Sequence, residues 1–242
     1  NSFGTQLAKS LKSKGHVVAN KALTRPDVQL TFIQTRKMYA PTLLRLDGIY
    51  FNTSADWKEQ NKVIELSYRS AQSVVFQTEF NQKLTETFFG KHPQTYIINN
   101  GTDLDFINQC QPAVIPEIAK FSEVWFSASS WRPHKRLKDN VEYFLRKAPI
   151  DACLLIAGAN PDYSIDHERI YYLGDLGREQ LISVYKIAKK FIHLSFLDHC
   201  PNVVVDARAC GCEIVCASSG GTHEIAGEDA TVIKDIDWDF SP

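Results

Sequence analysis

Residues 195–211 hold the densest group of polar side chains that could bind a ligand. An apolar strand is expected to end near Ser195, a loop to carry Asp198, and a helix to begin near Asn202. Free backbone amides in the first helical turn would face the same crevice as Asp198, which makes an anion site. Asp206 lies one turn into the helix and can reach a hydroxylated ligand. Alternatively, Asp198 or Asn202 only caps the helix and Asp206 is solvated.

A second polar group, within residues 129–137, is basic. Arg132 and Lys135 follow an expected strand at 124–126 and precede an expected helix near 136–147. Two cations at the edge of a sheet can neutralise a diphosphate as its charge develops. The alternative is that these residues form the exposed basic start of a helix.

Short β-rich runs and amphipathic stretches alternate along the chain. The expected strands are 17–19, 30–33, 43–46, 73–76, 95–98, 124–126, 153–156, 170–172, 191–194 and 213–216. The expected helices are 3–14, 56–71, 79–90, 136–147, 178–189, 202–210 and 222–226. Strands rich in Val, Ile and Leu without alternation are buried on both faces, which predicts parallel sheets covered by helices. We therefore expect an α/β protein with two Rossmann-like domains, whose ligands bind beyond the carboxyl ends of the strands.

The domain boundary is expected near residue 110. Residues 108–120 contain Gln and Pro and show no clear period, which is typical of a linker. The expected domains are 1–110, which would be truncated because its first strand is missing, and 111–242. The chain opens at Asn1 without an initiator Met or a signal segment, which indicates a fragment or a processed chain.

Composition excludes several classes of protein. Hydrophobic residues make up 44% and charged residues 23% of the 242 positions, which are ordinary globular values. The formal net charge of −1 provides no basic field, so we expect no nucleic-acid partner and at most peripheral contact with a membrane. No run of about 18 apolar residues predicts a membrane span. We expect a cytoplasmic protein.

Six cysteines are present, and four of them lie in the last quarter of the chain. Reduced thiols are expected rather than a disulfide scaffold in a chain of this size without secretory signals. A zinc site formed by four of them is the alternative, although no Cys-x-x-Cys knuckle is present and no metal site is expected. The four are Cys200, Cys210, Cys212 and Cys216.

The acidic segment resembles the donor-site motif of family 4 glycosyltransferases, retaining enzymes of the two-domain GT-B fold. Asp198 and Asp206 have the separation of the family's two glutamates, and Gly220-Gly221 and Glu224 follow as in the family. Both family glutamates are aspartates here, one methylene shorter, and Glu213 stands where the family usually has Pro. Three further segments also resemble the family. They are 129–137, the turn at 173–181 and Asn100-Gly101-Thr102-Asp103.

The resemblance implies a sugar transferase that uses a nucleotide-diphospho-sugar donor linked to UDP, GDP or ADP, without a cofactor or metal. It assigns the diphosphate to Lys135 with Arg132, the ribose to Asp206, and the donor sugar to Asp198. Amides near Pro201, Asn202 and Val203 would assist, and Leu176 would lie near the nucleobase. The acceptor would be a hydroxyl of a glycan or a lipid-linked molecule, as in polysaccharide biosynthesis. Residues 1–110 would form the acceptor domain, and residues 111–242 the donor domain.

The first half of the chain resembles the family less. Gly4, before the first expected helix, resembles the family's glycine loop, which approaches the donor. His16 begins an expected strand, which favours a structural role. Asp47 ends an expected strand facing the cleft, where it could orient an acceptor hydroxyl or simply form a turn with Gly48. The family's C-terminal helix, which returns to the first domain, is not expected here.

Two alternatives remain open. One is another enzyme on the same fold, such as a nucleotide-sugar epimerase or a phosphorylase. The other is a catalytically weak or inactive fragment that binds a nucleotide or a partner chain. The two Glu-to-Asp changes and the missing strand favour this second alternative.

Overall fold

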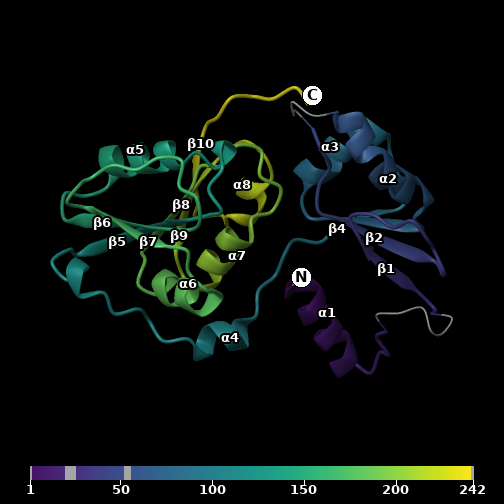
Figure 1. Cartoon of the computed structure of the whole chain (residues 1–242), viewed down its shortest axis with the longest axis horizontal. Helices are drawn as coiled ribbons and strands as arrows, with labels where there is room; N and C mark the ends of the chain where they lie inside the picture. The colour runs from purple at the N-terminus through teal and green to yellow at the C-terminus, as the bar shows by residue number, and fades with distance from the viewer. Residues whose placement is uncertain (1, 20–25, 52–55, 241–242) are drawn as a thin grey trace.

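The computed structural model describes residues 2–19, 26–51 and 56–240, and it contains two parallel sheets (Figure 1). The first sheet has the order β1-β2-β3-β4. Its strands are β1 (Gln29–Phe32), β2 (Thr42–Leu46), β3 (Ser73–Phe76) and β4 (Thr95–Ile97). All of its pairings are parallel, as the apolar runs predict.

The second sheet contains six strands in the order β10-β9-β8-β5-β6-β7. Its strands are β5 (Glu123–Ala128), β6 (Ala152–Ala157), β7 (Ile170–Gly174), β8 (Lys190–His193), β9 (Glu213–Ala217) and β10 (Thr231–Ile233). Strand order reverses between β5 and β8, which are neighbours in the sheet but separated along the chain by β6 and β7. In open α/β sheets, ligands bind at the carboxyl ends of the strands where the order reverses in this way.

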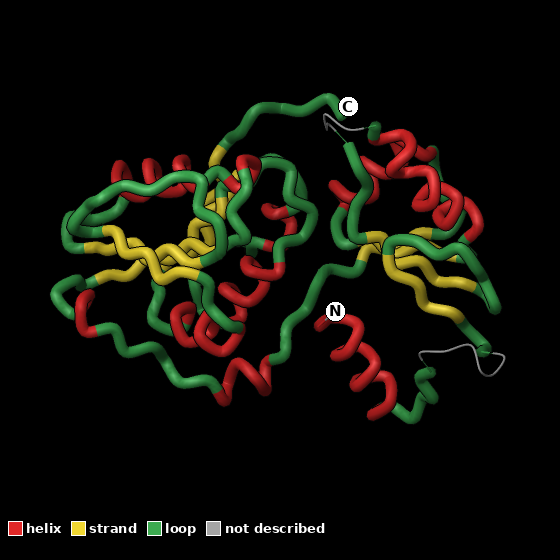
Figure 2. Tube along the Cα trace, viewed as in Figure 1, coloured by secondary structure: helices red, strands yellow, loops and turns green. Residues whose placement is uncertain are grey.

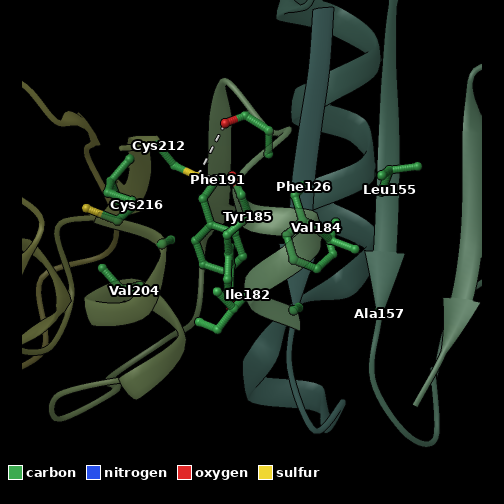
Figure 3. Packing of buried hydrophobic residues seen from close by; sticks show 14 of the residues in the cluster. Phe126, Leu155, Ala157, Ile182, Val184, Tyr185, Phe191, Val204, Cys212 and Cys216 are labelled. Carbon is green, nitrogen blue, oxygen red and sulfur yellow. Dashed lines mark hydrogen bonds between the residues drawn. The ribbon is translucent and has the colours of Figure 1, made fainter. Parts of the chain in front are cut away.

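Helices cover both faces of the second sheet, because its strands are apolar on both sides. One face carries α5 (Leu137–Lys147), and the other carries α6 (Arg178–Tyr185) and α7 (Asn202–Ala209) (Figure 1). On the second face, Phe126, Tyr185 and Phe191 point toward one another, with ring centroids 5.0 to 5.8 Å apart (Figure 3). This core fixes the strand ends that carry the polar loops. The short α8 (Thr222–Ile225) follows β9.

In the first half, two capped helices pack on the first sheet. Asp56, expected as the first helical residue, instead caps α2 (Trp57–Ser70), and Thr78 caps α3 (Glu79–Phe89), which is followed by Gly90. Their apolar faces join a core that includes Leu44, Leu46, Ile64, Tyr68, Val74, Phe76, Leu84 and Phe89. The remaining helix, α1 (Ser2–Ser13), contacts the sheet through Phe3, whose ring meets Phe32 at 5.9 Å.

The chain passes between the two halves twice (Figure 2). The first crossing leads through α4 (Leu104–Gln109), whose Ile107 is buried in the core of the second sheet. The second crossing is made by the C-terminal segment. There the ring centroids of Trp238 and Phe51 are 5.1 Å apart, and those of Phe240 and Phe80 are 5.9 Å apart. A return to the first half is therefore present, as an extended segment rather than a helix.

Several sequence expectations about elements are wrong or incomplete. Residues 17–19 form no strand, because Val17 is almost fully exposed and has no neighbouring strand to pair with among the described residues. The helix expected at 178–189 ends at Tyr185, since the chain must turn to start β8. The helix α4 and the edge strand β10 were not expected. No helix in the described ranges has the length and apolar character that a membrane crossing requires.

Candidate functional site

Asp198 and Lys135 meet at the carboxyl edge of the second sheet. Asp198 follows β8, Lys135 follows β5, and these two strands are neighbours, so their loops emerge side by side. The Lys135 ammonium donates to Asp198 Oδ2, and His193 Nε2 lies 3.0 Å from the same oxygen. The backbone amide of His199 donates to Oδ1 at 3.1 Å. The predicted pair of residues is thus in direct contact.

The Asp198 carboxylate is ionised in this setting. Burial by itself would raise the pKa of Asp198, but the His193 hydrogen bond and the positive charge of Lys135 outweigh it and hold this pKa far below its ordinary range. A carboxylate offers about four acceptor directions, of which three are used here. One direction at Oδ1 is left for a ligand hydroxyl.

The loop that carries Lys135 includes the 3-10 turn η2 (Pro133–Lys135). Arg136 closes this turn in the left-handed conformation, with φ of 52°, and α5 starts at the next residue. The Asn140 amide group donates to the carbonyl oxygens of Lys135 and Arg136 at 3.1 and 2.7 Å, which holds the loop against α5. Arg132 is exposed at the start of the turn, and its guanidinium has no ion pair among the described residues.

Helix α7 begins as the sequence predicts. Pro201 is buried at the N-cap position, Asn202 is exposed, and Val203 packs against the core of the second sheet. The amides of a first helical turn have no intrahelical acceptor and carry a partial positive charge. The first-turn amides of α7 therefore follow Asp198 by only a few residues in the same loop-to-helix segment.

Asp206 lies one turn into α7 and is bonded to the linker between the two sheets. The Thr102 hydroxyl donates to Asp206 Oδ1, and Arg178 Nη2 donates to the Thr102 oxygen at 3.2 Å. The Arg178 guanidinium lies over the Phe106 ring at 5.0 Å. Leu176 is half-buried two residues before Arg178, in the turn after β7. Asp206 is therefore near the expected nucleobase turn, but it contacts neither Asp198 nor Lys135 directly.

Asp47 follows β2 and points to the junction between the two halves. Its carboxylate accepts from Arg45 and, at 2.9 Å, from Gln77. Arg45 also donates to Asn100 Oδ1, and the Asn100 amide donates to Asn202 Oδ1 at 2.9 Å. Burial raises the pKa of Asp47, and the Arg45 charge opposes that rise. A chain of polar contacts thus joins the predicted acceptor residue to the start of α7.

Gly4 does not stand in a loop before the first helix, as expected, but inside α1. A Cβ at this position would lie 3.7 Å from the Phe32 ring, which is an ordinary van der Waals distance, so the packing of α1 on the sheet does not require a glycine here.

His199 was not predicted as a site residue. Its ring lies between the aromatic rings of Phe51 and Phe80, with centroids 5.9 and 5.5 Å away, and its carbonyl oxygen accepts from Thr78 Oγ1 at 3.1 Å. Its Nδ1 atom is buried and has no hydrogen-bond partner among the described residues. Burial, helped by Lys135 and opposed by Asp198, lowers the pKa of His199 to about 4, so the ring is neutral near pH 7.

The glycine pair Gly220-Gly221 allows the loop of Asp198 to pass close to the turn before α8. A Cβ on Gly220 would lie 2.5 Å from the Asp198 carbonyl oxygen, and one on Gly221 would lie 2.2 Å from that of His199. Three residues on, Glu224 accepts from the backbone amides of Glu79 and Phe80 at 2.6 and 2.8 Å. This family-like segment therefore supports the site loop and also fastens it to α3.

All six cysteines are free thiols, and five of them are buried. Burial raises the pKa of Cys200 to about 11 and that of Cys212 to about 12, so these thiols are inert at neutral pH. Across the described part of the chain, no group of three or more His, Cys, Asp or Glu side chains is arranged to hold a metal ion.

Two cavities lie away from these residues. One of about 430 Å³ is open along α3, lined by Glu79, Gln82, Lys83, Glu86, Thr87 and Lys91. The other, of about 240 Å³, lies between α5 and β10. Lys135, Asp198 and Asp206 line neither of these two cavities.

The fold is that of an α/β protein with two parallel Rossmann-like sheets, with Lys135 and Asp198 in contact at the carboxyl edge of the second. The sequence model of the family described as glycosyl transferases group 1 matches residues 116–239, more than half of the chain. The chain therefore belongs to this family. A comparison with curated proteins found no match.

Solved structures with the GT-B fold resemble the chain. HepE from Anabaena, solved in complex with UDP-glucose, has a TM-score of 0.64 and 18% identity, covering 81% of this chain and 58% of its own. Sucrose-phosphate synthase from Thermosynechococcus elongatus has a TM-score of 0.69 and 14% identity, and the match covers 95% of this chain and 64% of the synthase. A glycosyltransferase from Rickettsia africae has a TM-score of 0.62 and 14% identity, and the match covers 96% of this chain and 66% of that enzyme.

These structural similarities show the fold, which is the two-domain GT-B fold expected from the sequence. The chain spans about three fifths of the length of the solved proteins that it matches.

Proposed function

We propose that the chain binds a nucleotide-diphospho-sugar and transfers its sugar, with retention of configuration, to a hydroxyl acceptor. The observation that carries the proposal is the contact between Lys135 and Asp198 where the strand order of the second sheet reverses. A cation and a carboxylate at this edge can serve the two ends of one donor, the diphosphate and the sugar. Family membership and the UDP-glucose complex of HepE support this assignment.

In this proposal, Lys135 and Arg132 neutralise the diphosphate. Arg132 is exposed and has no described ion pair, so it can turn to a phosphate without breaking one. The amides at Asn202 and Val203, at the start of α7, add further donors. These groups stabilise the charge that builds on the leaving diphosphate, and the proposal includes no cofactor or metal.

Asp206 binds the ribose hydroxyls, with Leu176 beside the nucleobase. This placement is supported by Arg178, which donates to the Thr102 hydroxyl and so connects the turn that carries Leu176 to Asp206. Ribose hydroxyls would replace or share the Thr102 hydrogen bond. Donor binding is then coupled to the linker between the two sheets.

Asp198 accepts a hydrogen bond from a hydroxyl of the donor sugar through the free direction at Oδ1, and its charge steadies the positive charge at the anomeric carbon. Asp47 orients the acceptor hydroxyl, and the leaving phosphate oxygen takes the acceptor proton on the same face. Retention follows from this front-face attack and needs no second carboxylate nucleophile. We also propose that 1–110 is the acceptor domain and 111–242 the donor domain. The acceptor is a hydroxyl of a glycan or a lipid-linked molecule.

The test begins with ligand binding. Thermal unfolding of the chain is measured with UDP, GDP and ADP. A ligand at 100 times its dissociation constant stabilises the folded state by about 2.7 kcal/mol. We expect one nucleotide to raise the transition temperature in the wild type and to do so less in Lys135→Met and Asp206→Asn. A panel without any shift contradicts the proposed site.

The second step measures turnover. The sugar nucleotide with the preferred base is incubated with and without acceptor candidates, and nucleotide release is followed by chromatography. Transfer that needs an acceptor supports a glycosyltransferase, whereas an altered sugar without nucleotide release indicates an epimerase. Binding without turnover indicates an inactive nucleotide-binding chain.

A further inference from the structure

The carboxylate of Asp198 shares one oxygen between two donors. Oδ2 accepts from Lys135 and, at 3.0 Å, from His193 Nε2. The side chains of Asp198 and Lys135 are 15% and 18% exposed, and that of His193 is 3% exposed. The family resemblance assigns no role to His193, which is the last residue of β8.

The two donors differ in how freely they can move. His193 ends a central strand paired with β5 and β9, and its ring is buried beside the Phe191 ring. Lys135 sits in a 3-10 turn on a flexible four-carbon side chain and is the more exposed of the two. A phosphate that approaches this edge can therefore draw Lys135 away, while His193 stays in place.

If Lys135 moved away and His193 were absent, the buried Asp198 carboxylate would keep only the His199 backbone amide as a donor and would lose its charged partner, which is strongly unfavourable. His193 prevents this loss. Because Asp198 is ionised and only accepts hydrogen bonds, the hydrogen of a neutral His193 ring must be on Nε2. This hydrogen bond remains when Lys135 leaves.

We propose that His193 is a positioning residue that holds the Asp198 carboxylate and so frees Lys135 to bind the diphosphate of a nucleotide donor. The inference rests on the proposed function, because it takes Lys135 as the diphosphate ligand. Besides Asp198 and Lys135, two titratable groups interact with this cluster: His134, which lies in the same turn as Lys135, and the buried His199. The His134 side chain is exposed and does not replace His193 on Asp198.

The test compares two ligands that differ by one phosphate. Dissociation constants are measured by calorimetry for the nucleoside diphosphate that the wild type binds best among UDP, GDP and ADP, and for the matching monophosphate. We expect His193→Phe, which keeps a ring but removes the donor, to bind the diphosphate about tenfold more weakly, as for one lost hydrogen bond to a charged group. Binding of the monophosphate, which lacks the outer phosphate, should change much less.

Two further variants separate positioning from folding. His193→Gln keeps a neutral N–H donor and should retain most of the diphosphate affinity. In a Lys135→Met background, His193→Phe should have little further effect, because the cation that it frees is absent. If His193→Phe loses its thermal transition, His193→Leu takes its place in the same comparison.

The outcomes are distinguishable. Two results overturn the role of His193 and leave the proposed donor site intact. One is an equal loss of affinity for the diphosphate and the monophosphate in His193→Phe. The other is a double variant in which the affinity losses of Lys135→Met and His193→Phe add in full. A wild type that binds none of the three diphosphates overturns the donor site and this inference together.

Discussion

Glu224, in the second half of the chain, accepts hydrogen bonds from the backbone amides of Glu79 and Phe80, the first two residues of α3 in the first half. Its two carboxylate oxygens accept from the backbone amides of Phe80 at 2.8 Å and Glu79 at 2.6 Å. An acidic group at a helix N-terminus satisfies free amides and interacts well with the helix dipole. The contact joins the donor-side glycine turn to α3.

Replacing Glu224 should therefore weaken the whole chain. We expect Glu224→Ala to lower the free energy of unfolding by about 1 kcal/mol, as for the loss of a helix cap, and Glu224→Gln to lower it less. Urea denaturation followed by circular dichroism measures this difference. Glu228→Ala is the matched control, because Glu228 is exposed and forms no ion pair with the described residues. Equal effects at the two positions would contradict the capping role.

Gly48 should not tolerate a side chain. A Cβ at this position would lie 2.8 Å from His199 Nε2, and the residue has φ of 153°. We expect Gly48→Ala to destabilise the fold by about 1 to 3 kcal/mol, as for overpacking. Gly101→Ala is the control, since no atom lies within 4 Å of a Cβ there. If His199 is the obstacle, adding His199→Ala recovers part of the loss, and a fully additive double variant argues against it.

His199 should make stability depend on pH. Its pKa is lowered from 6.5 to about 4 in the folded chain by burial. Between these values the unfolded chain binds a proton that the folded chain does not, so stability falls as pH falls, by at most about 1.4 kcal/mol per pH unit. Denaturation series at several pH values should show a smaller decline for His199→Phe than for the wild type. Parallel curves for both proteins would disprove this source of the pH effect.

Asp206 should matter only for ligands that carry a ribose. We expect Asp206→Asn to weaken binding of the preferred nucleoside diphosphate about tenfold or more, because hydrogen bonds to a charged group are lost. Binding of inorganic pyrophosphate should stay the same. Thr102→Val serves as a companion variant, since it frees the same carboxylate without removing its charge. Equal weakening of both ligands by Asp206→Asn would place the ribose elsewhere.

Sugar transfer should not depend on a divalent cation. In the proposed function, Lys135, Arg132 and the amides of α7 neutralise the diphosphate. Treatment with EDTA should leave the rate of nucleotide release within about twofold of the untreated rate. A rate that collapses and returns when Mg²⁺ is added would assign this role to a metal instead.

The sequence predicted much of the fold because its local signals are strong. The strand expected at 73–76 and the helix that begins after Thr78 match the structure, since apolar runs and capping side chains act within a few residues. The expected strand at 17–19 failed, because an apolar run forms a strand only where another strand pairs with it. The expected position of Gly4 before the first helix was wrong as well, because α1 includes this residue, whereas its role in donor binding stays a prediction.

The candidate site was predicted in part. Lys135 and Asp198 were expected to share one edge because each follows an apolar strand, and the structure brings them into contact. His193 and His199 were missed, since their partners lie on other loops and no local spacing marks them. One signal could have identified His193, because it is a polar residue at the carboxyl end of a buried apolar strand.

The sequence by itself determined most of the strands and helices and that the sheets are parallel, and it placed the candidate site residues Lys135 and Asp198 after apolar strands. Only the tertiary structure decided the order of the strands, and with it the pairing of Lys135 with Asp198 and of Thr102 with Asp206. It also decided that Glu224 and the C-terminal segment reach the first half. The physical reason is range. Backbone propensity and apolar periodicity act over one turn or one strand, whereas these contacts join side chains that become neighbours only after the sheets have assembled.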